Sequence, residues 1–178
     1  MIILCGGSAS GKTTVALAMV KLGYKRVVTY TTRPIRKGEV DGVSYNFISN
    51  EKFAEMVKDG AFIEYATYRG WHYGTAVSSC TDDMNTVAVL TPAGLRNIRK
   101  AGIKVVSVYL QVDRVSRLIK LLERGDNPDE SYRRNVSDEG MFAGFEDESD
   151  IMINNDNYKM DKQAVLQKVL DDVDEFLS

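Results

Sequence analysis

A glycine-rich stretch near the start of the chain constrains the fold more than any other feature. Residues 6–13 read Gly-Gly-Ser-Ala-Ser-Gly-Lys-Thr and match the pattern G-x-x-x-x-G-K-[ST] at every position. The apolar residues 2–5 before it predict a buried strand, and residues 13–22 after it predict a helix that ends at Gly23. Because such a match arises by chance in roughly 1% of chains of this length, we interpret residues 6–13 as a phosphate-binding loop.

The chemistry of this loop requires the residue types found in it. Glycines allow several backbone N–H groups to point at one phosphate, and the N-terminus of the following helix faces the same anion. Lys12 is expected to act as a catalytic residue on the β- and γ-phosphates, and the Thr13 hydroxyl to bind the Mg²⁺ that accompanies ATP. The expected ATP-binding residues are Gly6, Ser8, Ser10, Gly11, Lys12, Thr13 and Thr14. The loop alone does not distinguish a kinase from a GTPase or an ATPase.

Strands and helices alternate along most of the chain. Further strands are predicted at residues 26–30, 86–90, 104–110 and 151–153. Further helices are predicted at residues 49–59, 92–100, 113–123 and 161–177. The last helix has an apolar stripe made of Val165, Leu166, Val169, Leu170, Val173, Phe176 and Leu177. This alternation predicts an α/β fold of three layers, in which helices flank a parallel sheet and ligands bind at the carboxyl ends of its strands.

Composition limits the class of protein. The chain has 178 residues, of which 44% are hydrophobic and 27% charged, with a formal net charge of -2, so bulk charge favours neither nucleic acid nor an anionic membrane. Its two cysteines, Cys5 and Cys80, are interpreted as free thiols in a reducing compartment. No apolar stretch approaches the ~18 residues of a membrane span, and the first residues lack a basic leader. We therefore expect a cytoplasmic protein, with a homo-oligomer left open.

A second set of basic residues lies between residues 29 and 47. Arg33, Arg36 and Lys37 stand there among several hydroxyl side chains. Arginine binds phosphate through two parallel N–H groups, and a tyrosine hydroxyl can add another donor. A second phosphate site in a protein with a phosphate loop suggests an acceptor that already carries a phosphate. On charge alone, a solvated basic loop explains the same residues.

The order and spacing of these residues resemble guanylate kinase. The pattern T-T-R-P-x-R-x-G-E-x-D-G-x-x-Y stands at residues 31–45, and the likeness continues through residues 47–49, 62–65 and 73–75. The resemblance implies transfer of a phosphoryl group from ATP to GMP or dGMP, in purine nucleotide metabolism. It also implies a core of residues 1–30, 83–123 and 145–178, a small mixed GMP-binding subdomain of residues 31–82, and a helical lid of residues 124–144.

The same resemblance implies a GMP site. Its phosphate would be held by Arg33, Arg36, Tyr45 and Tyr73, and its base would be read by Glu64, Thr75 and Thr29. Guanine presents two adjacent N–H donors that one carboxylate accepts, whereas adenine presents the opposite pattern, so Glu64 discriminates between them. Without the resemblance, an exposed charge on an edge strand explains Glu64 equally well. His72 is interpreted as a surface residue without a catalytic role.

The polar segment of residues 125–144 is expected to be mobile and to supply the lid. The basic residues around it are Arg117, Lys120, Arg124, Arg133 and Arg134. The resemblance implies that Arg124 and Arg134 embrace the transferring phosphoryl group, with Arg133 as the alternative to Arg134. Phosphoryl transfer requires alignment, charge neutralisation and exclusion of water. A solvated helical face explains Arg117 and Lys120.

The chain departs from guanylate kinases at one place. Two aspartates usual in the family are absent, and Val89 and Thr91 stand at those positions. Asp82 and Asp83 are expected to lie before the strand rather than to replace them. Two other functions therefore stay open: a kinase of the same fold with another acceptor, such as a ribose bisphosphate, and a guanylate-kinase-like binding module.

Overall fold

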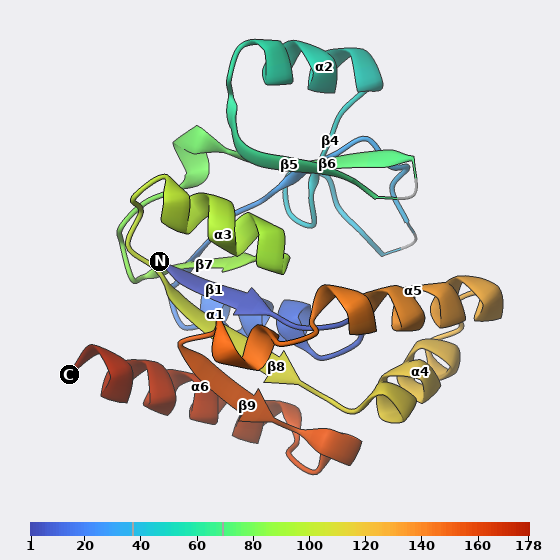
Figure 1. Ribbon diagram of the computed structural model, residues 1–178, viewed down its shortest axis with the longest axis vertical. Helices are drawn as coiled ribbons and strands as arrows, with labels where there is room; N and C mark the ends of the chain where they lie inside the picture. The colour runs from blue at the N-terminus through green and yellow to red at the C-terminus, as the bar shows by residue number, and fades with distance from the viewer. Residues whose placement is uncertain (37, 69) are drawn as a thin grey trace.

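A parallel sheet of five strands forms the centre of the computed structural model, which describes residues 1–36, 38–68 and 70–178 (Figure 1). Lys37, one of the basic residues expected near the acceptor, lies outside the described residues. The strand order is β2-β7-β1-β8-β9, with every neighbouring pair parallel. The strands are β2 (Lys25–Arg26), β7 (Thr86–Val89), β1 (Ile2–Cys5), β8 (Val106–Gln111) and β9 (Ile151–Asn154). The predicted parallel α/β sheet is confirmed.

Helices cover both faces of this sheet. Alternate residues of β1 point to opposite faces, so Ile2 and Leu4 pack with α1 and α6, while Ile3 and Cys5 pack with α3. The helices of the core are α1 (Lys12–Lys21), α3 (Pro92–Lys100), α4 (Arg114–Glu123) and α6 (Lys162–Leu177). The three layers predicted from the sequence are therefore present.

Local sequence explains where these helices begin. Thr91, Asp113 and Asp161 accept hydrogen bonds from backbone N–H groups in the first turns of α3, α4 and α6. Gly11 begins α1 with a φ of 97°, a left-handed conformation that glycine adopts without strain. Gly23 follows α1 with a φ of 101°, as its predicted capping role requires.

Two predictions from the sequence are wrong in part. The strand predicted at residues 26–30 is two short strands in different sheets, because the Val27 N–H still bonds to Val87 in the first sheet and the chain then crosses to the second. The apolar stripe of α6 ends early: Phe176 and Leu177 are 52% and 48% exposed, since they lie beyond the edge of the sheet that buries Val173.

A second, mixed sheet stands above the carboxyl ends of the first (Figure 1). Its order is β4-β3-β6-β5, with β3–β4 parallel and the other pairs antiparallel. The strands are β3 (Tyr30–Thr31), β4 (Asn46–Phe47), β5 (Phe62–Tyr68) and β6 (Trp71–Ala76), and α2 (Asn50–Lys58) packs against them. The rings of Phe53 and Phe62 stack at 4.6 Å and join the helix to the sheet.

The segment expected to form the lid contains a long helix, α5 (Pro128–Met141). It runs beside α4 (Figure 1), and Arg114 Nε donates to Asn135 Oδ1 at 2.9 Å between the two helices. Its buried side chains are polar: Ser131, Asn135 and Asp138. Three short 3₁₀ turns complete the described part: η1 (Val77–Ser79), η2 (Phe145–Asp147) and η3 (Asp156–Tyr158). Within the described ranges, no helix combines the length and apolar character needed to cross a bilayer.

Candidate active site

The glycine-rich loop joins β1 to α1 at the carboxyl end of the parallel sheet, where the fold predicts ligand binding. A side chain at Gly6 would lie 2.5 Å from the Leu110 carbonyl oxygen and from Ser10 Oγ, so the loop passes too close to β8 for any residue but glycine. The Ser10 N–H donates to the Gly7 carbonyl at 3.1 Å and tightens the turn. Thr13 and Thr14 stand exposed on the first turn of α1.

Lys12 folds back over this loop. Its Nζ donates to the Gly7 carbonyl at 2.6 Å and lies 3.4 Å from Ser10 Oγ. Burial lowers the pKa of Lys12 to about 8, and the Asp138 carboxylate opposes that effect. The ammonium group therefore lies against the loop, at the Gly7 carbonyl and Ser10.

A buried ion pair lies against the outside of the loop. Arg117 Nη1 is 3.0 Å from Asp138 Oδ2, and both residues are 7% exposed. The same Asp138 oxygen accepts the Ser8 N–H at 2.6 Å. The interpretation of Arg117 as part of a solvated face is therefore wrong, because α5 covers it, whereas Lys120 is solvated with 57% of its side chain exposed.

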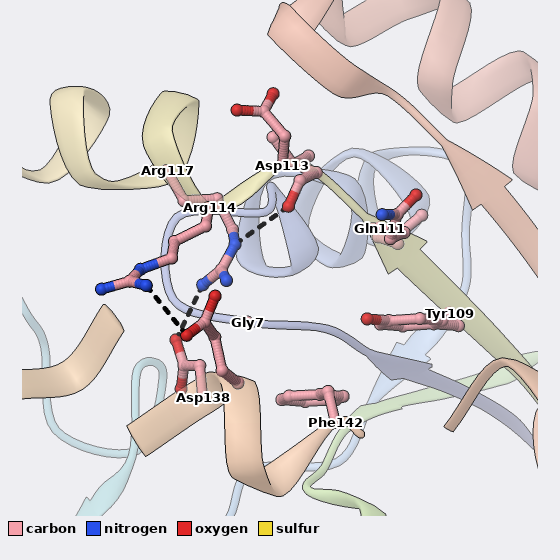
Figure 2. A pocket seen from close by; sticks show the side chains of 11 residues that line it. Gly7, Tyr109, Gln111, Asp113, Arg114, Arg117, Asp138 and Phe142 are labelled. Atoms are coloured by element: carbon pink, nitrogen blue, oxygen red, sulfur yellow. Dashed lines mark hydrogen bonds and ion pairs between the residues drawn. The ribbon is translucent and has the colours of Figure 1, made fainter. Parts of the chain in front are cut away.

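Figure 2 shows this pair from the adjoining pocket, a hollow of about 280 Å³ between β8, α4 and α5. Arg117 and Asp138 point toward one another beside Gly7, while Tyr109 and Phe142 form the opposite wall. These two rings stack at 5.5 Å with an interplanar angle of 1°. The pocket borders the phosphate loop on the side of the lid helix, away from the second sheet.

The predicted acceptor residues gather around Arg33, which is 6% exposed. Its guanidinium carbon lies 5.1 Å from the centre of the Tyr45 ring, and that ring is 6.2 Å from the ring of Tyr73. Two N–H groups of Arg33 bond to Glu39 at 2.7 and 2.6 Å. Glu39 thus presents to Arg33 the paired oxygens that a phosphate would present.

Arg36 lies near both Arg33 of this cluster and Arg134 of α5. Burial and the nearby Arg134 and Arg33 lower the pKa of Arg36. Arg134 is 13% exposed in its side chain, lies 3.7 Å from Asp126 and bonds to Glu130 at 2.9 Å. Arg124, at the end of α4, pairs with the same Asp126. The structure therefore turns Arg134 and Arg124 toward one carboxylate, whereas Arg133 is exposed.

Glu64 and Thr75, which the sequence predicted to read the base, lie next to one another. They are paired across β5 and β6, and Thr75 Oγ1 donates to Glu64 Oε1 at 2.6 Å. Burial raises the pKa of Glu64, and the hydrogen bond from Thr75 partly offsets this. Glu64 is half-buried on its edge strand rather than an exposed charge. Thr29 would lie opposite Thr75 if the β3–β6 register continued by one residue; within the described ranges, no hydrogen bond joins it to Glu64.

The first turn of α3 also borders Glu64. A side chain added at Gly94 in α3 would lie 3.4 Å from the Glu64 carboxyl carbon, so a glycine there leaves room for this carboxylate. Thr91 caps α3 by accepting the Gly94 N–H at 3.2 Å. Asp82 and Asp83 are engaged elsewhere, with the backbone N–H groups of Lys104 and Asn85, as their predicted position before the strand implies.

Three acidic residues of the site carried no assigned role in the sequence. Glu39 belongs to the acceptor pattern and holds Arg33, so its place in that pattern was an available signal. Asp126 joins the two lid arginines, and Asp138 bonds to the phosphate loop. Nothing in the spacing of Asp126 or Asp138 marks them, because their partners come from other elements.

His72 bonds to Thr67 at 2.9 Å and stacks on Phe53, away from this chemistry.

The residues around the loop fit Mg²⁺ held mainly by phosphate and water. The described residues contain no cluster of three or more His, Cys, Asp or Glu side chains suited to a metal. Thr13 offers one hydroxyl beside the lysine, and Mg²⁺ commonly uses one or two protein ligands with substrate phosphates. The donor set therefore suits a metal that arrives with ATP.

Comparisons with known proteins agree with this geometry. A profile of the guanylate kinase family matches residues 1–173. A relative named guanylate kinase, from Nostoc sp., is 32% identical over 174 residues, covering 93% of this chain and 86% of the relative. The crystal structure of guanylate kinase from Anaplasma phagocytophilum has a TM-score of 0.69 at 20% identity, covering 98% of this chain and 84% of that one.

A second solved structure shares the fold at greater distance. The YorR protein from Bacillus subtilis, in complex with phosphorylated GDP, has a TM-score of 0.52 at 18% identity, covering 98% of this chain and 96% of that one. The family profile and the Nostoc relative extend over nearly the whole chain, through both the phosphate loop and the acceptor cluster. The chain therefore belongs to the guanylate kinase family, and it is a nucleoside-monophosphate kinase.

Proposed function

We propose that this protein transfers the γ-phosphoryl group of ATP directly to GMP or dGMP, using the residues assembled at the carboxyl end of its sheet. The observation that carries the proposal is the pair of anion sites joined by arginines: the loop with Lys12 on one side, and Arg33 with its tyrosines on the other. Arg134 of α5 lies close enough to Arg36 to lower its pKa. This proximity supports a lid that would approach the acceptor side when both nucleotides are bound.

On the donor side, backbone N–H groups of the loop and the N-terminus of α1 hold the triphosphate. Lys12 exchanges the Gly7 carbonyl for the β- and γ-phosphates, and the Thr13 hydroxyl binds Mg²⁺. The metal, when bound with ATP, neutralises phosphate charge. Lys12, Arg124 and Arg134 stabilise the charge that develops on the transferring group. The α1 helix has no acidic residue in its first turn, which favours anion binding there.

On the acceptor side, the GMP phosphate replaces Glu39 as the partner of Arg33. Arg36, Tyr45 and Tyr73 complete the phosphate contacts. Glu64 accepts the two adjacent N–H donors of guanine. Thr29 donates to the base oxygen, or Thr75 does so after it releases its hydrogen bond to Glu64. The acceptor phosphate is ionised at neutral pH, so its oxygen attacks without a general base. Closure of the lid excludes water and suppresses hydrolysis of ATP.

The absence of carboxylates at Val89 and Thr91 favours one other candidate, a kinase of the same fold whose acceptor is a ribose bisphosphate. The paired Glu64 and Thr75 oppose it, because a sugar phosphate has no edge with two adjacent N–H donors. A binding module without activity is opposed by the complete phosphate loop and the lid arginines. A cytoplasmic location and a role in purine nucleotide metabolism remain predictions.

The acceptor is identified by an assay that couples ADP release to a visible signal. With ATP and Mg²⁺, we expect turnover with GMP and dGMP and little with AMP, IMP or ribose phosphates. Turnover confined to a ribose phosphate would replace the proposal with the alternative kinase. No turnover with any acceptor would favour the binding module.

A further inference from the structure

The outside of the phosphate loop is held by contacts that phosphate binding itself does not require. Asp138 of α5 accepts the Ser8 N–H at 2.6 Å. Its partner Arg117 donates through Nε to the Val112 carbonyl at 3.0 Å and lies directly against Gly7. A side chain built on Gly7 would clash with this guanidinium. The motif leaves position 7 free to be any residue, so the glycine found there is explained by Arg117.

A second contact holds the next residue of the loop. Ala9 has a φ of 65°, a left-handed conformation that costs conformational energy in a residue with a side chain. The Tyr158 hydroxyl donates to the Ala9 carbonyl at 3.0 Å. Asn157 and Tyr158 are themselves left-handed, with φ of 57° and 49°, and the Asn157 N–H donates to Asp113 at 2.8 Å. The turn at Asn157 and Tyr158, with two left-handed residues, thus places the Tyr158 hydroxyl against Ala9, the left-handed residue of the loop.

We propose that Arg117, Asp138 and Tyr158 are positioning residues that hold the phosphate loop in its ATP-binding shape before ATP arrives. The inference deepens the proposed function and rests on the same ATP site. Residues 7–9 are then fixed from three elements, α4, α5 and η3, all distant from the loop in sequence. Because a loop ordered beforehand loses less entropy on binding, these contacts raise affinity for the donor without touching it.

The first test removes the ion pair without changing net charge. Arg117→Leu/Asp138→Ala leaves the Ser8 N–H without its acceptor, and calorimetry with ADP and with ATP in Mg²⁺ should show binding about 10-fold weaker. GMP binding should be unchanged. The matched control is Glu139→Gln, which breaks the exposed ion pair of 3.1 Å with Arg114 between the same two helices, keeps the Arg114–Asn135 hydrogen bond, and should leave ADP binding unaltered.

A conservative pair separates positioning from charge. Arg117→Gln/Asp138→Asn removes both charges but retains an amide oxygen for the Ser8 N–H, so ADP binding should return to near the wild-type value. This rescue distinguishes a positioning hydrogen bond from a merely structural ion pair, because a loss caused by the missing charges would persist in the conservative pair.

The tyrosine is tested by removing one atom. Tyr158→Phe keeps the ring and should weaken ADP binding about 3-fold, the effect of one hydrogen bond of ordinary strength. Tyr132→Phe, an exposed tyrosine on α5, serves as its control. Thermal unfolding establishes that each variant is folded. If Arg117→Leu/Asp138→Ala does not fold, Tyr158→Phe still decides the question.

The inference is overturned if folded variants bind ADP as the wild-type protein does, or if ADP and GMP binding weaken equally. It is also overturned if the conservative pair binds ADP as weakly as Arg117→Leu/Asp138→Ala does. Failure of the wild-type protein to bind ATP or ADP would instead remove the proposed function on which the inference rests. If the wild-type protein binds ADP and the variants bind it equally well, only the inference about the positioning residues is removed.

Discussion

The donor and acceptor sides of the site prepare for their phosphates in different ways. On the donor side, Lys12 rests on the backbone of its own loop, at the Gly7 carbonyl. On the acceptor side, Arg33 is held by a carboxylate, Glu39, through two hydrogen bonds. A neutral carbonyl is easily exchanged for a phosphate, whereas a paired carboxylate must be displaced as an ion. The comparison indicates that binding of the donor depends on the shape of the loop. Binding of the acceptor depends on a phosphate displacing the Glu39 carboxylate from Arg33.

The largest expected effect tests the donor side. Lys12→Ala should lower kcat by about 10²–10³-fold, because it removes a preorganised positive charge from the transferring phosphoryl group. GMP binding, measured by calorimetry, should stay within about 2-fold of the wild-type value. Lys21→Ala at the other end of α1 is the control. Equal loss of GMP binding and of turnover would show that the two sides are not separate.

The next effect tests the acceptor side. Glu64→Gln should weaken GMP binding by about 10- to 100-fold, since the amide N–H₂ faces a guanine donor and leaves it unpaired. ATP binding should be unchanged, and the preference for GMP over AMP should fall. Glu55→Gln, an exposed change on α2, is the control. An unchanged preference for GMP would contradict the assignment of base reading to this residue.

The pH dependence of GMP binding sharpens the same assignment. Burial raises the pKa of Glu64, and its ionised form is the one that accepts two guanine donors. GMP affinity should therefore be full above this raised pKa and decline as pH falls through it, at a higher pH than for an ordinary glutamate. The GMP phosphate also titrates, so the profile is compared with that of Glu64→Gln. Identical profiles would assign the whole acid limb to the ligand.

The smallest expected effect concerns the missing carboxylates. Thr91→Asp should preserve the cap of α3, because aspartate is as good a capping residue as threonine. The added carboxylate lies one turn from Gly94, which borders Glu64, and should lower the KM for GMP by about 2- to 10-fold. Its negative charge should also move the acid limb of GMP binding to higher pH. No change in either quantity would place position 91 outside the acceptor site.

The sequence alone was sufficient to locate the phosphate loop. It was insufficient to show which residues pack around that loop. The loop could be read from residues 6–13 because backbone geometry there depends on glycines at fixed positions. The burial of Arg117 could not, because it depends on Asp138, which lies 21 residues further along and on another helix. A lone arginine on a predicted helix is ordinarily solvated, so the wrong interpretation followed from reading α4 without α5.

The acceptor side shows the same limit. The pattern of residues 31–45 located Arg33 and Tyr45, and the structure brings them together with Tyr73. The crossing between the two sheets near Val27 was missed, since a β-rich run does not reveal which sheet each half joins. The sequence thus predicted the order of helices and parallel strands, whereas contacts that need a partner from another element were missed.

The central claim is that two nucleotides face each other across one phosphoryl group. A crystal structure with ADP, Mg²⁺ and GMP tests it most directly. We expect the GMP phosphate on Arg33, its base on Glu64, and the ADP β-phosphate in the loop beside Lys12, with the two phosphates turned toward one another. Nucleotides bound far apart, or a guanine away from Glu64, would contradict the claim.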